Sequence, residues 1–451
     1  MSAARTGRND TASGAERYRG RTMREYLVVF LVAGLVTFLA TPVVRLAATR
    51  LHMMAAPRER DVHVIPTPRG GGVAMYLGVG AAVLVASRLP ALRQTFDDSQ
   101  TVAVLAAGGV ICLLGVLDDK FGLDALTKLT GQIASAGVMV LLGVQLSFVF
   151  LPVADIGTLS LGSDVGVPVT VLLTILTVNA LNFIDGLDGL AAGVSAIAAL
   201  AFFAYSYNLG LTGYDQVASA PALITAVLAG ACLGFLPHNF SPARIFMGDS
   251  GSMLVGLMLS AAAVTATGNV DPQTFDSAAS LLPLALPLLV PIAVLFIPFV
   301  DLVLAVVRRT RRGRSPFAPD KMHLHHRLLA IGHSHRRAVL VMYFWAALLS
   351  GGAVALSVTG GRVELLVAIG ALLVVGIVVV LAPRTRRAAR EARAAELLAQ
   401  RQRSRAAHPT GRVARTTSTA APGGPERPAT ASRVAAVRTA PRAPGSDRVA
   451  H

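Results

Sequence analysis

Cysteine is nearly absent from this chain of 451 residues. Its two copies, Cys112 and Cys232, both lie inside apolar runs. That placement excludes a disulfide framework and the repeated spacing of a structural zinc site, and it predicts two small buried hydrophobes. Charged residues are also scarce, at 15%, where a soluble domain carries about 25%. Together with 53% hydrophobic residues, this scarcity is typical of a polytopic membrane protein.

Basic charge is scarce in the middle of the chain, although the net charge is +16. The segment from Pro383 onward holds fifteen Arg and four acids, a balance of +11, and residues 1–25 contribute another +3. Basic tails of this kind lie against anionic lipid or stay solvated more often than they bind DNA. We therefore predict no nucleic-acid partner.

Apolar runs of about 17–25 residues, each long enough to cross a bilayer, recur along the chain. They predict an all-α membrane protein with about eleven transmembrane helices, at 26–46, 71–88, 100–117, 125–146, 165–182, 190–208, 217–236, 251–268, 281–306, 337–358 and 363–382. The four prolines of 281–306 predict a kinked or broken helix. The segment 147–164 is predicted to be a loop with strand character.

This pattern divides the chain into three segments. Residues 1–25 form a basic tail, 26–382 a transmembrane domain, and 383–451 a basic and largely disordered tail that begins with a short amphipathic helix at 385–405.

The orientation follows from the distribution of Lys and Arg. The connections 47–70 and 307–336 are rich in Arg, whereas 147–164, 209–216 and 269–280 contain neither Lys nor Arg. Arginine-rich loops stay in the cytoplasm, which places the C-terminal tail inside and the N-terminus outside. The six Arg of residues 1–25 oppose that placement, and a count of ten spans would remove the conflict.

Acidic side chains without basic partners mark the stretch Asn179–Gly193, NALNFIDGLDGLAAG, between two apolar runs. A carboxylate in hydrocarbon costs about 2.5–3.5 kcal/mol, so such acids need a partner or a function. Four more polar segments fall on the same predicted side: His63–Gly72, Asp118–Lys120, Phe246–Ser252 and Asp320–Arg327. Their convergence predicts a cytoplasmic-face site for phosphates and a divalent metal.

Two acidic pairs lie in these segments. Asp118 and Asp119 are adjacent and diverge by about 100° on a helix, so one could act as a base or metal ligand while the other holds Lys120 or Lys128. A solvated helix end is the alternative. Asp185 and Asp188 share a face if their turn is helical, and Asn182 would complete an oxygen-rich corner suited to Mg²⁺ or Mn²⁺.

The segment Met247–Ser252 places Asp249 at a helix start. Free backbone N–H groups there could bind phosphate while Asp249 binds the metal that the phosphate carries, and an ordinary N-cap is the alternative.

Histidines and a rigid basic loop supply candidate phosphate ligands. His323, His325, His326 and Arg327 could hold a pyrophosphate, with a zinc site as the rival interpretation. The loop HVIPTPRGGG from His63, with Thr67 and Arg69, could meet a nucleotide, or be a membrane-proximal basic turn. His333 and His335 are predicted to be surface residues.

Five motifs, in order, together resemble the polyprenyl-phosphate N-acetylhexosamine-1-phosphate transferases, the WecA and TagO group of the larger family that includes MraY. They are PTPRGGG at 66–72, LDDK at 117–120, NALNFIDGLDGLAAG at 179–193, FSPARIFMGDSGS at 240–252 and RGRSPFAPDKMHLHHRLL at 312–329. The HLHH sequence favours the hexosamine group over MraY, which usually has three consecutive histidines. At Arg60–His63 the chain departs from the family by lacking a Lys after the Arg.

The resemblance implies transfer of a sugar-1-phosphate, most simply N-acetylglucosamine-1-phosphate, from a UDP-sugar to polyprenyl phosphate, with release of UMP. It implies a bacterial plasma-membrane enzyme of cell-envelope biogenesis that uses Mg²⁺, with Mn²⁺ as a substitute, and that could form a homodimer. It implies Asp118, Asp119 and Asp249 as catalytic residues and Asp249 and Asn182 at the metal. The implied substrate-binding residues are Asn179, Asp185, Asp188, His323, His325, His326, Arg327, His63, Thr67 and Arg69.

Three alternatives remain at this point. The first is a phospho-N-acetylmuramoyl-pentapeptide transferase, and the second is a cation-coupled transporter, since intramembrane acids also mark ion pathways. The third is a non-catalytic scaffold.

Overall fold

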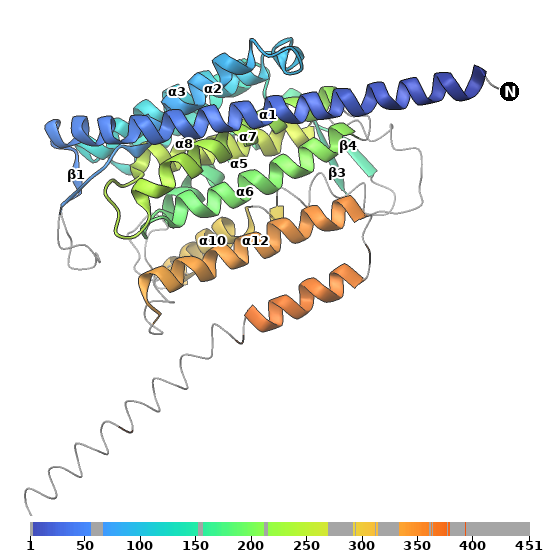
Figure 1. Cartoon of the computed structure of the whole chain (residues 1–451). Coiled ribbons are helices and arrows are strands. Elements are labelled where there is room, and N and C mark those ends of the chain that lie inside the picture. Colours follow the sequence, from blue (N-terminus) through green and yellow to red (C-terminus); the bar gives the residue numbers. More distant parts are fainter. Residues whose placement is uncertain are drawn as a thin grey trace, which may run out of the picture. The chain divides into compact units, whose positions relative to one another are not determined.

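A computed structural model describes most of the membrane domain (Figure 1). The described residues are 3–55, 66–151, 157–211, 215–268, 292–293, 295–311, 313, 333–359, 362, 364–376, 378 and 393. The chain divides into two compact units, Met1–Glu391 and Ala392–His451, and the description below concerns the first. The predicted helix at 385–405 and the predicted disorder of 383–451 lie, apart from Arg393, outside the described residues.

The described part is almost entirely helical, because a chain that crosses lipid must satisfy its backbone hydrogen bonds within the segment. The helices are α1 (Ala3–Arg50), α2 (Gly71–Ala86), α3 (Gln100–Phe121), α4 (Ala125–Leu141), α5 (Ser163–Ile184), α6 (Leu190–Leu209), α7 (Asp215–Asn239), α8 (Gly248–Gly268), α10 (Phe296–Arg311) and α12 (His335–Thr359). A short 3-10 helix, η1 (Arg93–Phe96), joins α2 to α3.

Seven described helices are long and apolar enough to cross a membrane: Thr22–Arg50 within α1, α3, α5, α6, Ser219–Asn239 within α7, Gly248–Thr267 within α8, and α12. Three shorter apolar helices, Gly71–Ala86, Ala125–Leu141 and Glu364–Gly376, coincide with further predicted spans. The all-α polytopic fold is thus confirmed. The predicted span 281–306 lies largely outside the described residues, so the count of eleven or ten stays a prediction.

Four strands form two small antiparallel pairs. β1 (Met54–Ala55) pairs with β2 (Thr67–Pro68), and β3 (Phe148–Leu151) pairs with β4 (Gly157–Ser160) in the register Phe148 to Ser160. The second pair confirms the strand character predicted for 147–164. In Figure 1 the β1 end and the β3–β4 hairpin lie at opposite ends of the helices.

The core surrounds α8, whose residues are almost all buried and which packs against α2, α3, α5 and α7. Small residues allow this closeness, as expected where helices associate in lipid by packing alone. A Cβ on Gly256 of α8 would lie 2.6 Å from the Cα of Val178 on α5. The predicted burial of Cys112 and Cys232 is also confirmed.

The helices alternate in direction, so their polar ends meet at one end of the bundle. The C-terminal ends of α3 and α5 lie beside the N-terminal ends of α4 and α8, because Asp118, Lys128, Asn182 and Asp249 are in contact there. The same end carries the β1–β2 pair, since Phe246 donates its N–H to Pro68 O at 2.9 Å. This end holds the candidate site.

Candidate active site

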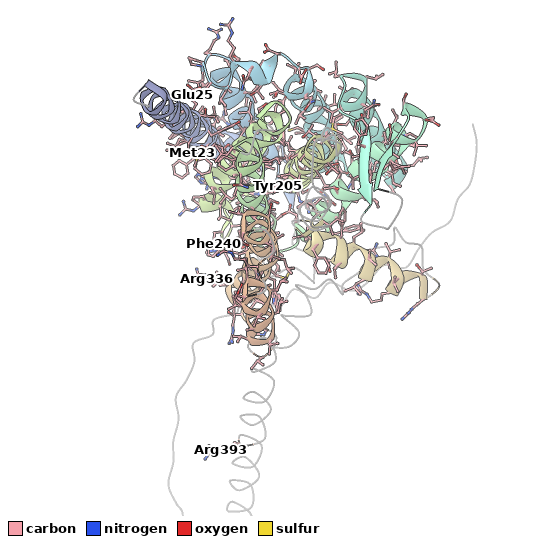
Figure 2. All side chains as sticks on the ribbon, turned by 90° about the vertical axis from the view of Figure 1, so that its right-hand side faces the viewer. Met23, Glu25, Tyr205, Phe240, Arg336 and Arg393 are labelled. Carbon is pink, nitrogen blue, oxygen red and sulfur yellow. The ribbon has the colours of Figure 1, made fainter. Side chains whose placement is uncertain are left out.

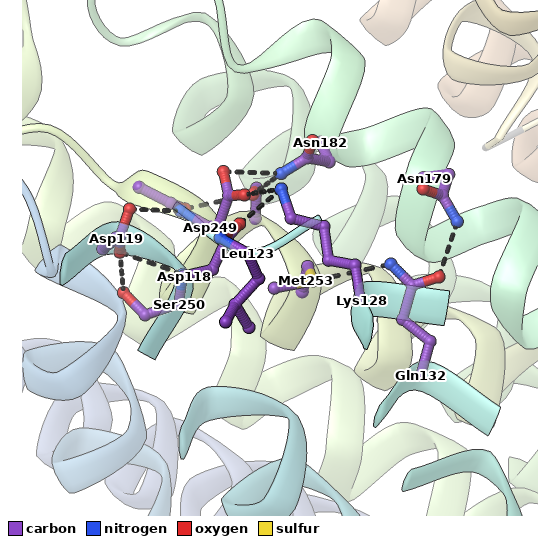
Figure 3. A network of polar contacts seen from close by, with 12 residues as sticks. Asp118, Asp119, Leu123, Lys128, Gln132, Asn179, Asn182, Asp249, Ser250 and Met253 are labelled. Atoms are coloured by element: carbon purple, nitrogen blue, oxygen red, sulfur yellow. Dashed lines mark hydrogen bonds and ion pairs between the residues drawn. The ribbon is translucent and has the colours of Figure 1, made fainter. Parts of the chain in front are cut away.

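The centre of the candidate site is a contact between two carboxylates and a lysine (Figure 3). Lys128 on α4 forms an ion pair with Asp118 near the end of α3, and its Nζ lies 2.5 Å from Asp249 Oδ2 in the first turn of α8. Asn182 on α5 donates its amide N–H to Asp249 Oδ1 at 3.0 Å and to Ser252 Oγ at 2.9 Å. The structure thus brings together the predicted residues Asp118, Asn182 and Asp249.

Lys128 reaches this position because Asp124 caps the start of α4. The Asp124 carboxylate accepts the N–H groups of Leu126 and Thr127 at 2.9 and 3.0 Å, and the Thr127 hydroxyl at 2.6 Å. The bonds from Thr127 and then Leu126 hold the pKa of Asp124 below its ordinary value. Lys128 follows one helical turn after this cap, so its side chain points back to Asp118.

Asp119 faces a different group from its neighbour Asp118, as adjacent helical positions require. Its carboxylate accepts the N–H of Asp249 at 3.0 Å, the N–H of Ser250 at 3.2 Å and the Ser250 hydroxyl at 3.0 Å. It therefore binds two of the N–H groups at the start of α8 that were predicted to be available to a phosphate. The expectation of free N–H groups is wrong for Asp249 and Ser250, because a carboxylate from another helix already binds them.

Asn179 lies one turn before Asn182 and links α5 to α4. Its amide donates to Gln132 Oε1 and to Ile175 O, both at 2.8 Å, while Gln132 Nε2 lies 3.6 Å from the sulfur of Met253 on α8. These bonds satisfy polar groups between three helices. The predicted role of Asn179 in substrate binding stays a prediction.

Asp185 ends α5 and lies against the start of α8. Burial raises the pKa of Asp185 to about 8, and the carboxylates of Asp249 and Asp119 act in the same direction. The Arg69 guanidinium and a hydrogen bond with the backbone of Gly248 oppose this shift. Asp185 thus extends the acidic cluster toward the loop that contains Arg69.

Asp188 turns away from Asp185. The segment between α5 and α6 is a turn rather than a helix, so the shared face that a helical turn would create does not form. Asp188 is buried, and its Oδ2 accepts the N–H of Ala243 at 3.0 Å. Its described contacts place it against the loop that leads into α8. Its part in substrate binding stays a prediction.

Three glycines allow the segments around the site to approach one another. A Cβ on Gly72 at the start of α2 would lie 2.2 Å from the carbonyl carbon of Ser250. A Cβ on Gly115 of α3 would lie 2.3 Å from the Cα of Ser250. Gly71 donates its N–H to Phe246 O at 3.1 Å. This contact joins the PTPRGGG and FMGDSGS motifs, with Thr67 buried in β2 and Arg69 following it.

Several predicted residues lie outside the described part of the chain. They are His63, His323, His325, His326 and Arg327, and their places at the site stay predictions.

Lys128 and two histidines have contacts or burial that their sequence context did not indicate. Lys128 was a candidate partner for an acid but not a site residue, although a lone lysine in an apolar helix of this kind is itself a signal. The surface placement predicted for His333 and His335 is wrong. His333 is 5% exposed, and His335 Nε2 accepts the N–H of Asp188 at 3.1 Å. His333 precedes α12 and His335 begins it, and the contact of His335 with Asp188 joins this helix start to the turn between α5 and α6.

An acidic centre between the ends of membrane helices is typical of a membrane enzyme or transporter, and comparison with known proteins identifies the family. The profile of glycosyl transferase family 4 matches residues 101–267. The decaprenyl-phosphate N-acetylglucosaminephosphotransferase of Mycobacterium tuberculosis H37Rv is 52% identical over 364 residues, which are 80% of this chain and 90% of that protein.

Two further relatives have names of the same kind. The protein of the same name from Mycolicibacterium smegmatis is 51% identical over 370 residues, 82% of this chain and 91% of the relative. A probable undecaprenyl-phosphate N-acetylglucosaminyl 1-phosphate transferase of Bacillus subtilis is 35% identical over 338 residues, 74% of this chain and 86% of the relative. The chain therefore belongs to glycosyl transferase family 4, in the group of polyprenyl-phosphate N-acetylhexosamine-1-phosphate transferases, and the resemblance seen in the five motifs is confirmed.

Proposed function

We propose that this multi-pass membrane protein transfers N-acetylglucosamine-1-phosphate from UDP-N-acetylglucosamine to polyprenyl phosphate. The products are polyprenyl diphosphate N-acetylglucosamine and UMP. The observation that carries the proposal is the contact of Asp118, Asp249 and Lys128 at the ends of three helices. A site at helix ends can meet a lipid phosphate held in the bilayer and a nucleotide that arrives from water.

In this reaction an oxygen of the lipid phosphate attacks the phosphorus atom attached to the sugar. The bond from that phosphorus to the UMP oxygen breaks, and UMP leaves with the bonding electrons. Phosphoryl transfer requires positioning and charge neutralisation more than covalent chemistry from the protein. Of the adjacent acids, Asp118 shares Lys128 with Asp249, whereas Asp119 positions Asp249 by accepting its N–H.

The donor groups present suit Mg²⁺. Asp118 and Asp249 meet at Lys128, Asp119 binds the N–H of Asp249, and Asp185 lies near Arg69. Acidic side chains therefore outnumber the cations among these six described residues. The Lys128 ammonium already lies where a cation bridges two carboxylates. Among the described residues no three His, Cys, Asp or Glu side chains form a complete metal site. Mg²⁺ does not need one, because it commonly uses one or two carboxylates together with waters and substrate phosphates.

Asp249 and Asp118 would hold Mg²⁺, with the carbonyl oxygen of Asn182 as a further ligand. The ion would supply charge neutralisation on the transferred phosphate. Mn²⁺ prefers similar oxygen ligands and would substitute.

In this proposal, the end of the helix bundle that holds the candidate site lies on the cytoplasmic side of the membrane. Arg50 ends α1, just before the β1–β2 pair, and Arg309 in the last turn of α10 lies 5.2 Å from the centre of the Phe183 ring near the end of α5, so both lie at the end that holds the acidic cluster. Arginine-rich ends stay in the cytoplasm, where UDP-sugars are made available to the enzyme. The bacterial plasma membrane and the homodimer remain predictions of the same kind.

The test is a transfer assay in membranes that contain the full chain, with polyprenyl phosphate, Mg²⁺ and UDP-N-acetylglucosamine labelled in the sugar. Labelled lipid and an equal amount of UMP are expected. UDP-N-acetylmuramoyl-pentapeptide serves as a parallel donor, and preferred use of it would favour the alternative transferase. Absence of transfer from every UDP-sugar tested would overturn the proposal, provided that the Bacillus subtilis relative is active under the same conditions.

A further inference from the structure

The turn Asp185–Gly189 between α5 and α6 is held by side chains from two other helices. The N–H of Asp188 donates to His335 Nε2 at 3.1 Å, and the N–H of Gly189 donates to Asn239 Oδ1 at 3.0 Å. The hydroxyl of Tyr343 donates to Gly189 O at 2.5 Å. A turn whose backbone is bound in this way has a defined position, because its polar groups are bound to protein side chains.

The bond to His335 defines the proton position on that imidazole. A backbone N–H can only donate, so Nε2 of His335 must carry a lone pair. The neutral imidazole consequently carries its proton on Nδ1. The interaction therefore depends on an acceptor at the Nε2 position and not on positive charge.

Asp185 is the first residue of this turn, only three residues before Asp188. Its carboxylate faces the backbone of Gly248 at the start of α8. A displacement of the Asp188 amide would move Asp185 relative to Asp249, which follows Gly248. The turn also lies beyond Ile184 and before Leu190, the ends of two spans, and Gly186 within it is exposed. A turn at the ends of two spans is within reach of a water-soluble donor.

We propose that His335 is a positioning residue for the nucleotide-sugar donor, which acts by holding the Asp188 amide and with it Asp185. This inference rests on the proposed function. His335 does not need to touch the donor. Its loss should weaken donor binding while it leaves the use of the lipid acceptor nearly unchanged.

The docking of α12 itself does not depend on His335. Arg336 Nη2 donates to Ser241 O at 3.0 Å, close to Phe240 (Figure 2), and Tyr343, about two turns further along α12, donates to Gly189 O. The ring of Tyr343 also packs on Gly193, where an added Cβ would lie 2.0 Å from it. These contacts keep α12 on α6 when the imidazole is replaced.

The experiment compares three variants of the full-length protein in the transfer assay. In His335→Gln the side-chain carbonyl oxygen lies about as far from Cα as Nε2 and can accept the Asp188 N–H. His335→Asn has the same amide on a shorter side chain that does not reach, and His335→Leu has no acceptor. We expect KM for UDP-N-acetylglucosamine to rise roughly tenfold in the Asn and Leu variants and to stay within about threefold of wild type in the Gln variant, since tenfold corresponds to the loss of one hydrogen bond. KM for polyprenyl phosphate should change less than about twofold in all three.

Donor KM values that are unchanged in His335→Asn and His335→Leu would overturn the inference, as would a Gln variant as impaired as the Asn variant. Equal increases in both KM values, or failure of the Asn and Leu variants to accumulate in membranes, would assign His335 to general stability and would also overturn it. An inactive wild-type protein would instead count against the proposed function, so the two failures are distinguishable.

Discussion

The carboxylate of Asp119 on α3 accepts the backbone N–H of Asp249 on α8 at 3.0 Å. Asp119 also accepts the N–H and the hydroxyl of Ser250, so it caps the start of α8. This helix begins at Gly248, 127 residues after α3 ends at Phe121. The same helix turn carries the Asp249 carboxylate that meets Lys128. Asp119 thus defines where Asp249 stands without facing Lys128 itself.

Replacement of Asp119 tests this separation of roles. Asp119→Ala should lower the stability of the protein by about 1–3 kcal/mol, because two backbone N–H groups and a hydroxyl lose their acceptor. Turnover should fall as well, since Asp249 is displaced. Asp118→Asn should abolish turnover with a smaller effect on stability. Thermal unfolding in detergent and the transfer assay measure the two quantities, and equal stability of wild type and Asp119→Ala would contradict the capping role.

Lys128 should compete with Mg²⁺ for the same carboxylates. Lys128→Met removes the cation between Asp118 and Asp249, so the apparent Mg²⁺ concentration for half-maximal turnover should fall several-fold, in proportion to an interaction of about 1 kcal/mol. The maximal rate should fall too, because a positive charge near the transferred phosphate is lost. Turnover measured against free Mg²⁺ gives both quantities. Lys120→Met is the matched control, since Lys120 is exposed and lies over Phe121.

Gly72 tests the close approach of α2 to α8. Gly72→Ala should destabilise the protein by about 3 kcal/mol or more, because the new Cβ would meet the backbone of Ser250 at 2.2 Å. Gly80→Ala, in the same helix, has no atom within 4 Å of its Cβ and should change stability by less than about 1 kcal/mol. Unfolding temperatures of the two variants in detergent make the comparison. Similar values would show that α2 and α8 are not packed as described.

Asp185 should make stability depend on pH. Its pKa is raised by burial to about 8, so the folded protein keeps a proton that the unfolded chain releases near pH 4. The stabilisation is fully present below about pH 4 and is lost as pH rises toward 8. The unfolding temperature, measured in a metal-free buffer with chelator, should fall less steeply from pH 5 to 8 in Asp185→Asn than in wild type. Parallel curves would contradict the raised pKa.

The spans and the motifs could be predicted from the sequence for a simple reason. Hydrocarbon imposes one length and one composition on every crossing segment, so α3, α6 and α12 begin and end within a few residues of the predicted runs. The strand character of 147–164 was also predicted, whereas the pairing of β3 with β4 as a hairpin was not. Acids without basic neighbours at the ends of such runs indicated a site, because lipid tolerates them only with partners.

The roles of neighbouring acids could not be predicted from spacing. Asp118 and Asp119 differ by one position, and only the packing of α3 on α8 shows that one meets Lys128 and the other meets a helix start. Asp185 and Asp188 would share a face in a helix, but the chain turns there, and their carboxylates bind different segments. His335 had no local signal, since its partner lies 147 residues earlier in the chain.

The sequence alone was enough to establish a helical membrane protein and its family, to predict most of its spans and to propose the residues that carry its chemistry. These features depend on the local balance between water and hydrocarbon, which each segment satisfies within itself. The tertiary structure alone decided that Lys128 joins Asp118 to Asp249, that Asp119 caps α8 and that His335 holds the turn Asp185–Gly189. Those are contacts between distant segments, and they depend on how close glycines such as Gly72 and Gly115 allow the helices to approach.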